Sequence, residues 1–92
     1  MFITKIDLEL EFHTDPGHGW LRVPYHFLKK FNILDKITSC SFIKGNWAYL
    51  EEDCDLSTLT SALSMKGIAV DWQEKSINKY SPIRSYDHFS TR

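Results

Sequence analysis

The stretch FHTDPGHGWLRVP near the N-terminus gathers the side chains with the most chemistry in the chain. His13, Asp15 and His18 are ligand types that zinc accepts, since imidazole nitrogens and carboxylate oxygens both bind it. A zinc site needs three or four ligands with supporting hydrogen bonds, at helical or knuckle spacings that this stretch lacks. Cys54 or His26 would have to complete it from elsewhere in the fold. We therefore expect no metal and no cofactor, with both loop histidines exposed.

A cysteine nucleophile is the second candidate, in the stretch LEEDCDLS. A helix N-terminus would favour the thiolate of Cys54, but four neighbouring acids raise the pKa of a thiol. These acids are Glu51, Glu52, Asp53 and Asp55. We expect Cys54 to be a buried thiol at a helix start, Cys40 to be a strand residue, and both to be reduced. No phosphate-binding glycine loop is present, and no catalytic constellation remains, so the sequence predicts a protein that is not an enzyme.

Basic and aromatic side chains instead indicate binding. One group surrounds a predicted helix: Arg22, His26, Lys29, Lys30 and Lys36. A second group mixes cations with rings near the C-terminus: Lys75, Lys79, Tyr80, Arg84 and Tyr86. Cations beside rings suit a phosphodiester chain or a protein groove, so these ten residues are the predicted partner-binding set. A merely solvated helix face explains the first group equally well.

Charge is unevenly distributed between the two parts of the chain. Residues 1–74 contain seven Lys/Arg and eleven Asp/Glu, whereas residues 75–92 contain four and one, for a net charge of −1. A basic segment behind an acidic body indicates that the segment has a separate role. We therefore divide the chain into an α+β domain, 1–74, and a basic, aromatic C-terminal arm, 75–92, that is partly ordered at best.

The elements that must position these side chains follow from local patterns. Residues 2–13 alternate between apolar and polar, which predicts a strand with Phe2, Ile6, Leu8, Leu10 and Phe12 on its inner face. Asp15, Pro16 and Gly17 predict a type II turn, in which the aspartate bonds the backbone ahead, and residues 20–23 give a second strand. Pro24 then suits the first turn of a helix with an apolar face of Phe27, Leu28 and Phe31.

The second half predicts another hairpin, a helix and a final strand. Strands over 39–44 and 47–52 flank a Gly45-Asn46 turn, which pairs Phe42 with Tyr49. That aromatic pair is either a platform for stacking bases or, as we favour, core beneath the helices. Asp55 caps a helix that ends at Gly67, and residues 68–72 alternate as a strand.

The predicted fold is therefore a single small α+β domain. It has two helices on one face of a mostly antiparallel sheet of about five strands, in the order β-β-α-β-β-α-β. No apolar run approaches the ~18 residues of a membrane helix, and the N-terminus lacks the apolar region of a signal peptide. We expect the protein to act in the cytoplasm where it is made.

Three motifs also carry a resemblance: FHTDPGHGWLRVP, YLEEDCD and IRSYDHF. They resemble small phage and plasmid proteins, and the whole chain is similar to phage-encoded type I-F anti-CRISPR inhibitors. The resemblance implies a non-enzymatic, monomeric inhibitor that docks on the crRNA-guided surveillance complex and prevents target DNA from binding or hybridising. Its expected partners are the backbone subunits of that complex, with crRNA as a further contact.

Two rival functions remain open at this point. A nucleic-acid-binding regulator of a phage or plasmid would use the hairpin aromatics and the basic arm directly, and its binding would weaken steeply with salt. A small metal-dependent hydrolase would carry stoichiometric zinc or manganese, which we do not expect.

Overall fold

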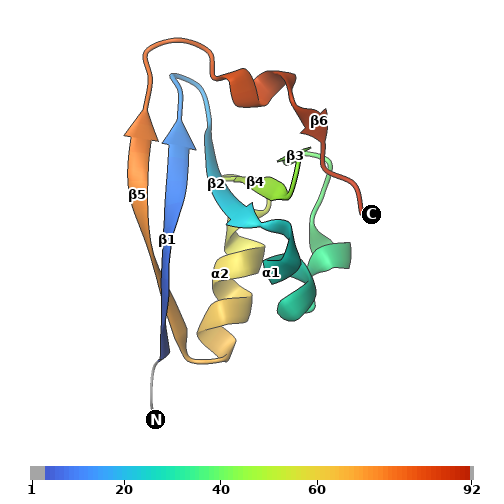
Figure 1. Cartoon of the computed structure of the whole chain (residues 1–92). Coiled ribbons are helices and arrows are strands. Elements are labelled where there is room, and N and C mark those ends of the chain that lie inside the picture. The colour runs from blue at the N-terminus through green and yellow to red at the C-terminus, as the bar shows by residue number, and fades with distance from the viewer. Residues whose placement is uncertain (1–3, 92) are drawn as a thin grey trace.

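A six-stranded sheet organises the chain in the computed structural model, which describes the backbone of residues 4–91 and the side chains of residues 10–91 (Figure 1). The strands are β1 (Thr4–Thr14), β2 (Gly19–Pro24), β3 (Phe42–Lys44), β4 (Trp47–Glu51), β5 (Ile68–Ser76) and β6 (Asp87–His88). The helices are α1 (Tyr25–Lys30) and α2 (Leu56–Met65), with 3₁₀ turns η1 (Leu34–Lys36) and η2 (Pro82–Ser85). The order across the sheet is β5-β1-β2-β4-β3-β6. The predicted α+β class is confirmed, with six strands rather than five.

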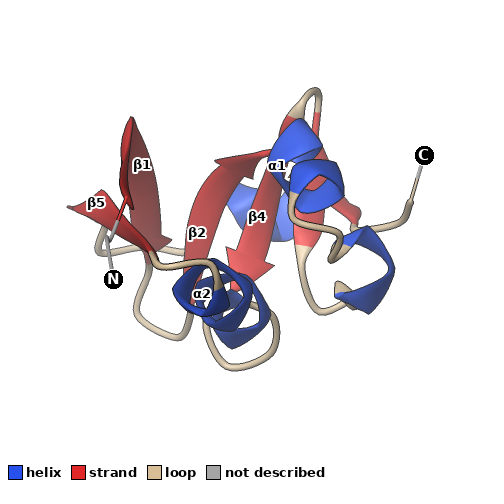
Figure 2. Cartoon of the chain, turned by 90° about the horizontal axis from the view of Figure 1, so that it is seen from below, coloured by secondary structure: helices blue, strands red, loops and turns tan. Residues whose placement is uncertain are grey.

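Both helices pack on one face of the sheet, where the main core lies (Figure 2). Leu28 of α1 and Leu59 of α2 are fully buried against Leu21 and Leu50 of the central strands. Burial of these side chains is the main favourable contribution to folding, at about 25 cal/mol per Å² of apolar surface. The predicted alternation of the first strand holds at Leu10 and Phe12, which are buried. The other predicted inward positions, Phe2, Ile6 and Leu8, lie outside the described side chains.

The first hairpin turns through residues 15–18, as predicted. The Asp15 carboxylate accepts hydrogen bonds from the backbone N–H groups of Gly17 and His18, so the aspartate does bond the backbone ahead. The predicted type II turn is wrong, because Gly17 does not adopt a positive φ. The turn is instead closed by a 2.9 Å bond from the Asp15 N–H to the His18 carbonyl.

The second hairpin has the predicted register, but its aromatic pair occupies the other face of the sheet. Phe42 pairs with Tyr49, and Gly45 adopts the left-handed φ of 60° that the turn requires. Ile43 points toward the helices, so Phe42 and Tyr49 point away from them. The preferred prediction of a core beneath the helices is therefore wrong for this pair, which packs beneath the C-terminal segment.

Helix α2 begins after Asp55 and ends before Gly67, whose φ of 70° stops it as predicted. The Asp55 side chain, however, makes no capping bond to the helix. Its buried carboxylate accepts instead from the N–H and hydroxyl of Thr38 and from the hydroxyl of Ser41. The predicted cap is wrong because three donors from the 38–41 turn satisfy this carboxylate first.

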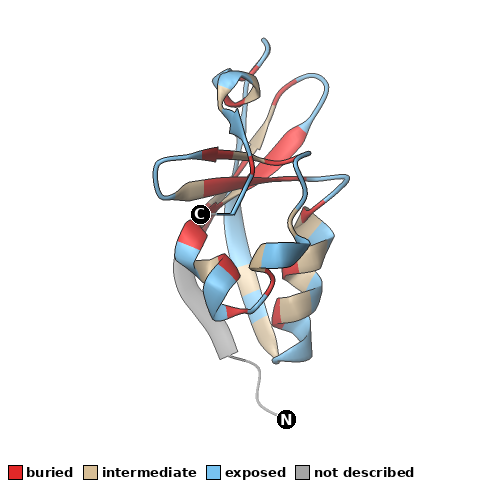
Figure 3. Ribbon diagram, turned by 90° about the vertical axis from the view of Figure 1, so that its right-hand side faces the viewer, coloured by how far each residue is buried: buried red, intermediate tan, exposed pale blue. Residues whose placement is uncertain are grey.

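The C-terminal segment is part of the fold rather than a loose arm. β5 pairs in parallel with β1 and continues to Ser76, so the boundary predicted at residue 74 falls inside a strand. Farther on, β6 pairs with β3, Ile83 is buried against Trp20, and Phe89 is buried on the helical side. Figure 3 shows buried strand segments between the helices and this C-terminal segment. The segment lacks sequence periodicity because isolated side chains, rather than a continuous face, anchor it.

Among the residues that the structure describes, no helix combines the length and the apolar character needed to cross a membrane.

Candidate functional site

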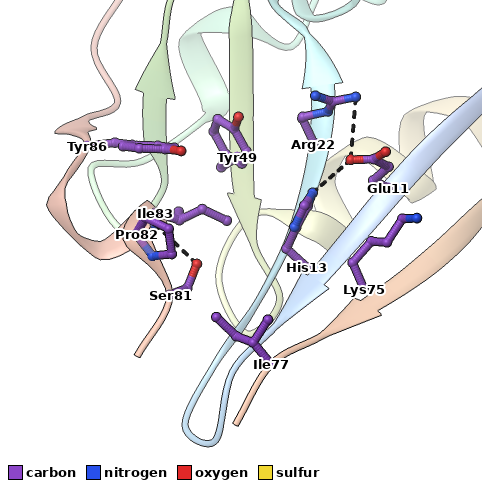
Figure 4. A pocket seen from close by; sticks show the side chains of 10 residues that line it. All are labelled: Glu11, His13, Arg22, Tyr49, Lys75, Ile77, Ser81, Pro82, Ile83 and Tyr86. Atoms are coloured by element: carbon purple, nitrogen blue, oxygen red, sulfur yellow. Dashed lines mark hydrogen bonds and ion pairs between the residues drawn. The ribbon is translucent and has the colours of Figure 1, made fainter. Parts of the chain in front are cut away.

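A groove opens on the sheet face opposite the helices, between the end of β5 and the turn η2 (Figure 4). Its volume is about 450 Å³. We call it the sheet groove, and it is lined by Glu11, His13, Arg22, Tyr49, Lys75, Ile77, Ser81, Pro82, Ile83 and Tyr86. The groove exists because the C-terminal segment buries Trp20 and Tyr49 on this face but leaves Glu11, His13 and Arg22 partly exposed.

One wall carries a small charge network. The Glu11 carboxylate accepts a 2.9 Å bond from His13 and lies 3.5 Å from the Arg22 guanidinium (Figure 4). The hydrogen bond from His13 is the main cause that lowers the pKa of Glu11, with Arg22 and Lys75 adding favourable charge. Arg22 also lies 4.0 Å from the ring centre of Trp47, a cation–π contact. Its cation is therefore largely compensated within the protein.

The opposite wall is aromatic. Tyr49 and Tyr86 lie with ring centres 5.2 Å apart, and the Lys44 ammonium is 4.5 Å from the Tyr86 ring. Burial raises the pKa of Tyr49, so its phenol stays protonated at neutral pH. Ile83 supports both rings from η2. This wall offers apolar contact with a hydroxyl edge, the character of a protein-binding hot spot.

Asp15 and Arg84 fix the segment that forms the groove's rim. The Asp15 carboxylate, fully buried, accepts from Arg84 Nε at 2.6 Å, from Arg84 Nη2 at 2.9 Å and from the Ser81 N–H at 2.9 Å. This bidentate pair lowers the pKa of Asp15 well below its usual range. Arg84 is thus committed to a structural role, although it was predicted to contact a partner. Tyr80 stacks near it and remains exposed.

A second predicted group lies on the other side of the sheet. His26, Lys29 and Lys30 on α1 and Lys36 on η1 are all exposed, and we call them the basic helix surface. Within the described part of the chain, none of these four forms an ion pair. Arg22 faces away from them, because its neighbours Leu21 and Val23 point into the core beneath the helices.

Seven of the ten predicted residues therefore lie on two separate surfaces, whereas Lys79, Tyr80 and Arg84 lie on neither. Arg22, Lys75 and Tyr86 meet in the sheet groove, whereas the basic helix surface stands apart. Lys79 is exposed in the loop before η2 and belongs to neither. Sequence reasoning missed Glu11 and His13 as groove residues, although their outward alternation in the first strand was the available signal.

A third cluster joins the first hairpin turn to the loop before α2. His18 Nδ1 lies 3.0 Å from Glu51 Oε1, and a ligand oxygen of Asp53 lies within 4.8 Å of both. Cys40 and Cys54 are neighbours here, and both are exposed, so the predictions of a buried Cys54 and of a strand position for Cys40 are wrong. The contact with Cys40, with smaller effects from burial and Glu51, raises the pKa of Cys54 to about 12. A pKa raised in this way keeps the thiol protonated at neutral pH, which disfavours a nucleophilic role.

Comparison with known proteins gives no match: no family model fits the chain, and no curated protein or solved structure is significantly similar to it.

Proposed function

We propose that this protein is a non-enzymatic inhibitor that binds the type I-F crRNA-guided surveillance complex and blocks target DNA from binding or hybridising. The proposal combines the resemblance of the three sequence motifs with one structural observation. Four exposed basic or histidine side chains lie on α1 and the following turn η1, without an ion pair to an acid among the described residues, on a chain of net charge −1. Unpaired surface cations favour an anionic partner group and speed its capture.

The two surfaces suit two kinds of contact within one ribonucleoprotein. Lys29, Lys30 and Lys36 suit crRNA phosphates or acidic side chains of a subunit. The sheet groove suits a segment of a protein subunit, since its Arg22 is already paired with Glu11 and its far wall is aromatic. Acidic body residues would then face the Lys/Arg-lined path that target DNA normally takes. The inhibitor would act in the bacterial cytoplasm as a monomer.

The alternative, a nucleic-acid-binding regulator, receives less support from the geometry. It would use hairpin rings as a stacking platform, which requires exposed ring faces. Tyr49 is buried beneath the C-terminal segment, and Phe42 is partly buried against Trp20 and His88. These rings are therefore not free to stack on bases.

A binding experiment with purified type I-F surveillance complex tests the proposal. The wild-type chain should co-elute with the complex and abolish its binding of target DNA. The double charge reversal K29E/K30E should weaken both effects at least tenfold. K66E is the matched control, because Lys66 is exposed at the far end of α2. Binding to naked RNA or DNA with no binding to the complex would favour the regulator, and K29E/K30E equal to wild type would remove the basic helix surface from the interface.

A further inference from the structure

We propose that His18, Glu51 and Asp53 bind one divalent transition-metal ion of the zinc class. The three side chains come from the first hairpin turn, the end of β4 and the loop before α2. One ligand atom from each lies within 4.8 Å of the others. The site goes beyond the proposed function, since it depends on none of the partner-binding residues. It also reverses the expectation, drawn from sequence spacing, that this loop would hold no metal.

Two of the three ligand atoms are already near coordination spacing. His18 Nδ1 and Glu51 Oε1 lie 3.0 Å apart. Two ligands on a tetrahedral zinc ion with bonds of about 2.0–2.1 Å are about 3.3 Å from each other. An ion that binds here would replace the hydrogen bond between His18 and Glu51 with one metal bond to each. The distance between their ligand atoms would change little. Asp53 is exposed, so rotation of its side chain can bring its carboxylate the remaining distance.

The buried ligand is held by its surroundings. The Glu51 side chain is only 8% exposed, and its second oxygen accepts a 2.7 Å bond from the Asp53 N–H. The Glu51 N–H donates to the Ser41 hydroxyl, which in turn donates to the buried Asp55 carboxylate. The bond from the Asp53 N–H orients the carboxylate, as bonds behind a metal ligand do, and the bonds through Ser41 fix the backbone of Glu51.

The donor set selects the class of metal. An imidazole nitrogen with two carboxylate oxygens suits zinc and its neighbours, whereas calcium and magnesium prefer oxygen alone. Three protein ligands leave at least one position open, as in zinc sites that also bind water. His18 and Glu51 also line a cavity of about 270 Å³, together with Cys40, Arg84 and His88. Bound metal would cross-link the hairpin turn to the loop before α2.

Isothermal titration of the full chain, without an affinity tag, with zinc chloride tests this site. We expect one ion per chain, and a loss of affinity of at least tenfold in each of H18Q and D53N. The matched controls E52Q and H26Q should bind like wild type, because both side chains are exposed outside the cluster. Circular dichroism checks that each variant folds; His18 and Asp53 are exposed, so we expect native spectra.

Cobalt substitution gives a second, independent readout. Nitrogen and oxygen ligands predict visible d–d bands without a sulfur-to-cobalt charge-transfer band. Wild type that binds no zinc, or H18Q that binds as tightly as wild type, would overturn the site. A charge-transfer band, together with loss of binding only in C40S/C54S, would place the metal on the two thiols and overturn the proposed ligands. None of these outcomes bears on binding to the surveillance complex.

Discussion

At the scale of a single residue, the Asp15 carboxylate connects parts of the chain that are far apart in sequence. It is fully buried and accepts from the backbone of its own turn, from the Ser81 N–H and from Arg84. Asp15→Asn keeps the shape of the side chain but removes its negative charge. The new amide NH₂ group then faces N–H donors that the carboxylate had accepted from. We expect a loss of about 3 kcal/mol in the free energy of unfolding, measured by urea denaturation. A variant as stable as wild type would show that Arg84 is not held by this pair.

The same carboxylate predicts a pH dependence of stability. Arg84 and three backbone donors lower the pKa of Asp15 in the folded state, whereas the unfolded value is about 3.9. Its stabilising contribution is therefore complete above about pH 5 and is lost as the pH falls toward the folded pKa. The urea midpoint of wild type should fall more steeply between about pH 5 and 2 than that of Asp15→Asn. Asp35→Asn, at an exposed position, should follow the wild-type curve.

Gly19 is a second residue with a specific structural demand. A Cβ added there would lie 2.7 Å from Phe12 Cζ, inside the buried core. Gly19→Ala should therefore cost about 1–3 kcal/mol, and the cost should shrink when Phe12→Leu removes the ring tip. Gly45→Ala meets no atom within 4 Å but must keep a φ of 60°, so its cost of about 1 kcal/mol should not change with Phe12→Leu. Thermal or urea unfolding of the double variants separates the two mechanisms.

The sequence alone predicted some hydrogen-bond partners of the buried aspartates but not others. The Asp15 bonds to its own turn were predictable because they span two and three residues. Its bonds to Ser81 and Arg84 span more than sixty residues, and no local pattern encodes them. Asp55 shows the same limit. Its position predicts a bond to the start of α2, but its carboxylate accepts instead from Thr38 and Ser41 in another turn.

At the scale of elements, the C-terminal segment is the clearest test of the fold. β6 adds an edge to β3, and Phe89 is 5% exposed with its ring stacked on Tyr25. Phe89→Ala should lower the free energy of unfolding by about 3–4 kcal/mol. Tyr80→Ala should cost under about 1 kcal/mol, since that ring is 75% exposed. Equal, small effects in urea denaturation would mean that the segment contributes little to stability.

Whether an element could be predicted depends on how close together in the sequence its determining residues lie. Both hairpins and both helices were predictable, because period-two alternation, turn glycines and apolar helix faces lie within a few residues. The parallel pairing of β5 with β1 and the addition of β6 to β3 depend on contacts across the chain. β6 has only two residues, too few to show any alternation. For that reason the sequence predicted a partly ordered arm where the structure has a segment that completes the sheet.

At the scale of the whole molecule, the sheet separates the two surfaces proposed to bind a partner. The basic helix surface lies on the helical side, and the sheet groove lies on the opposite face. An inhibitor with surfaces on two faces can contact two neighbouring parts of a large assembly at once, as repeated backbone subunits on a guide RNA would present. The set of ten partner-binding residues stays a prediction, and sequence order could not show which face each one would occupy.

This separation predicts additive effects on binding to the surveillance complex. K29E/K30E changes the basic helix surface, and K75E changes the wall of the sheet groove. Because the two surfaces share no residue and lie on opposite faces of the sheet, the binding free energies lost should add to within about 0.5 kcal/mol in the combined variant, measured by titration at fixed salt. A coupling above about 1 kcal/mol would mean that one contiguous contact spans both sites. If K75E binds as tightly as wild type while K29E/K30E does not, the groove lies outside the interface and the basic helix surface alone carries the docking.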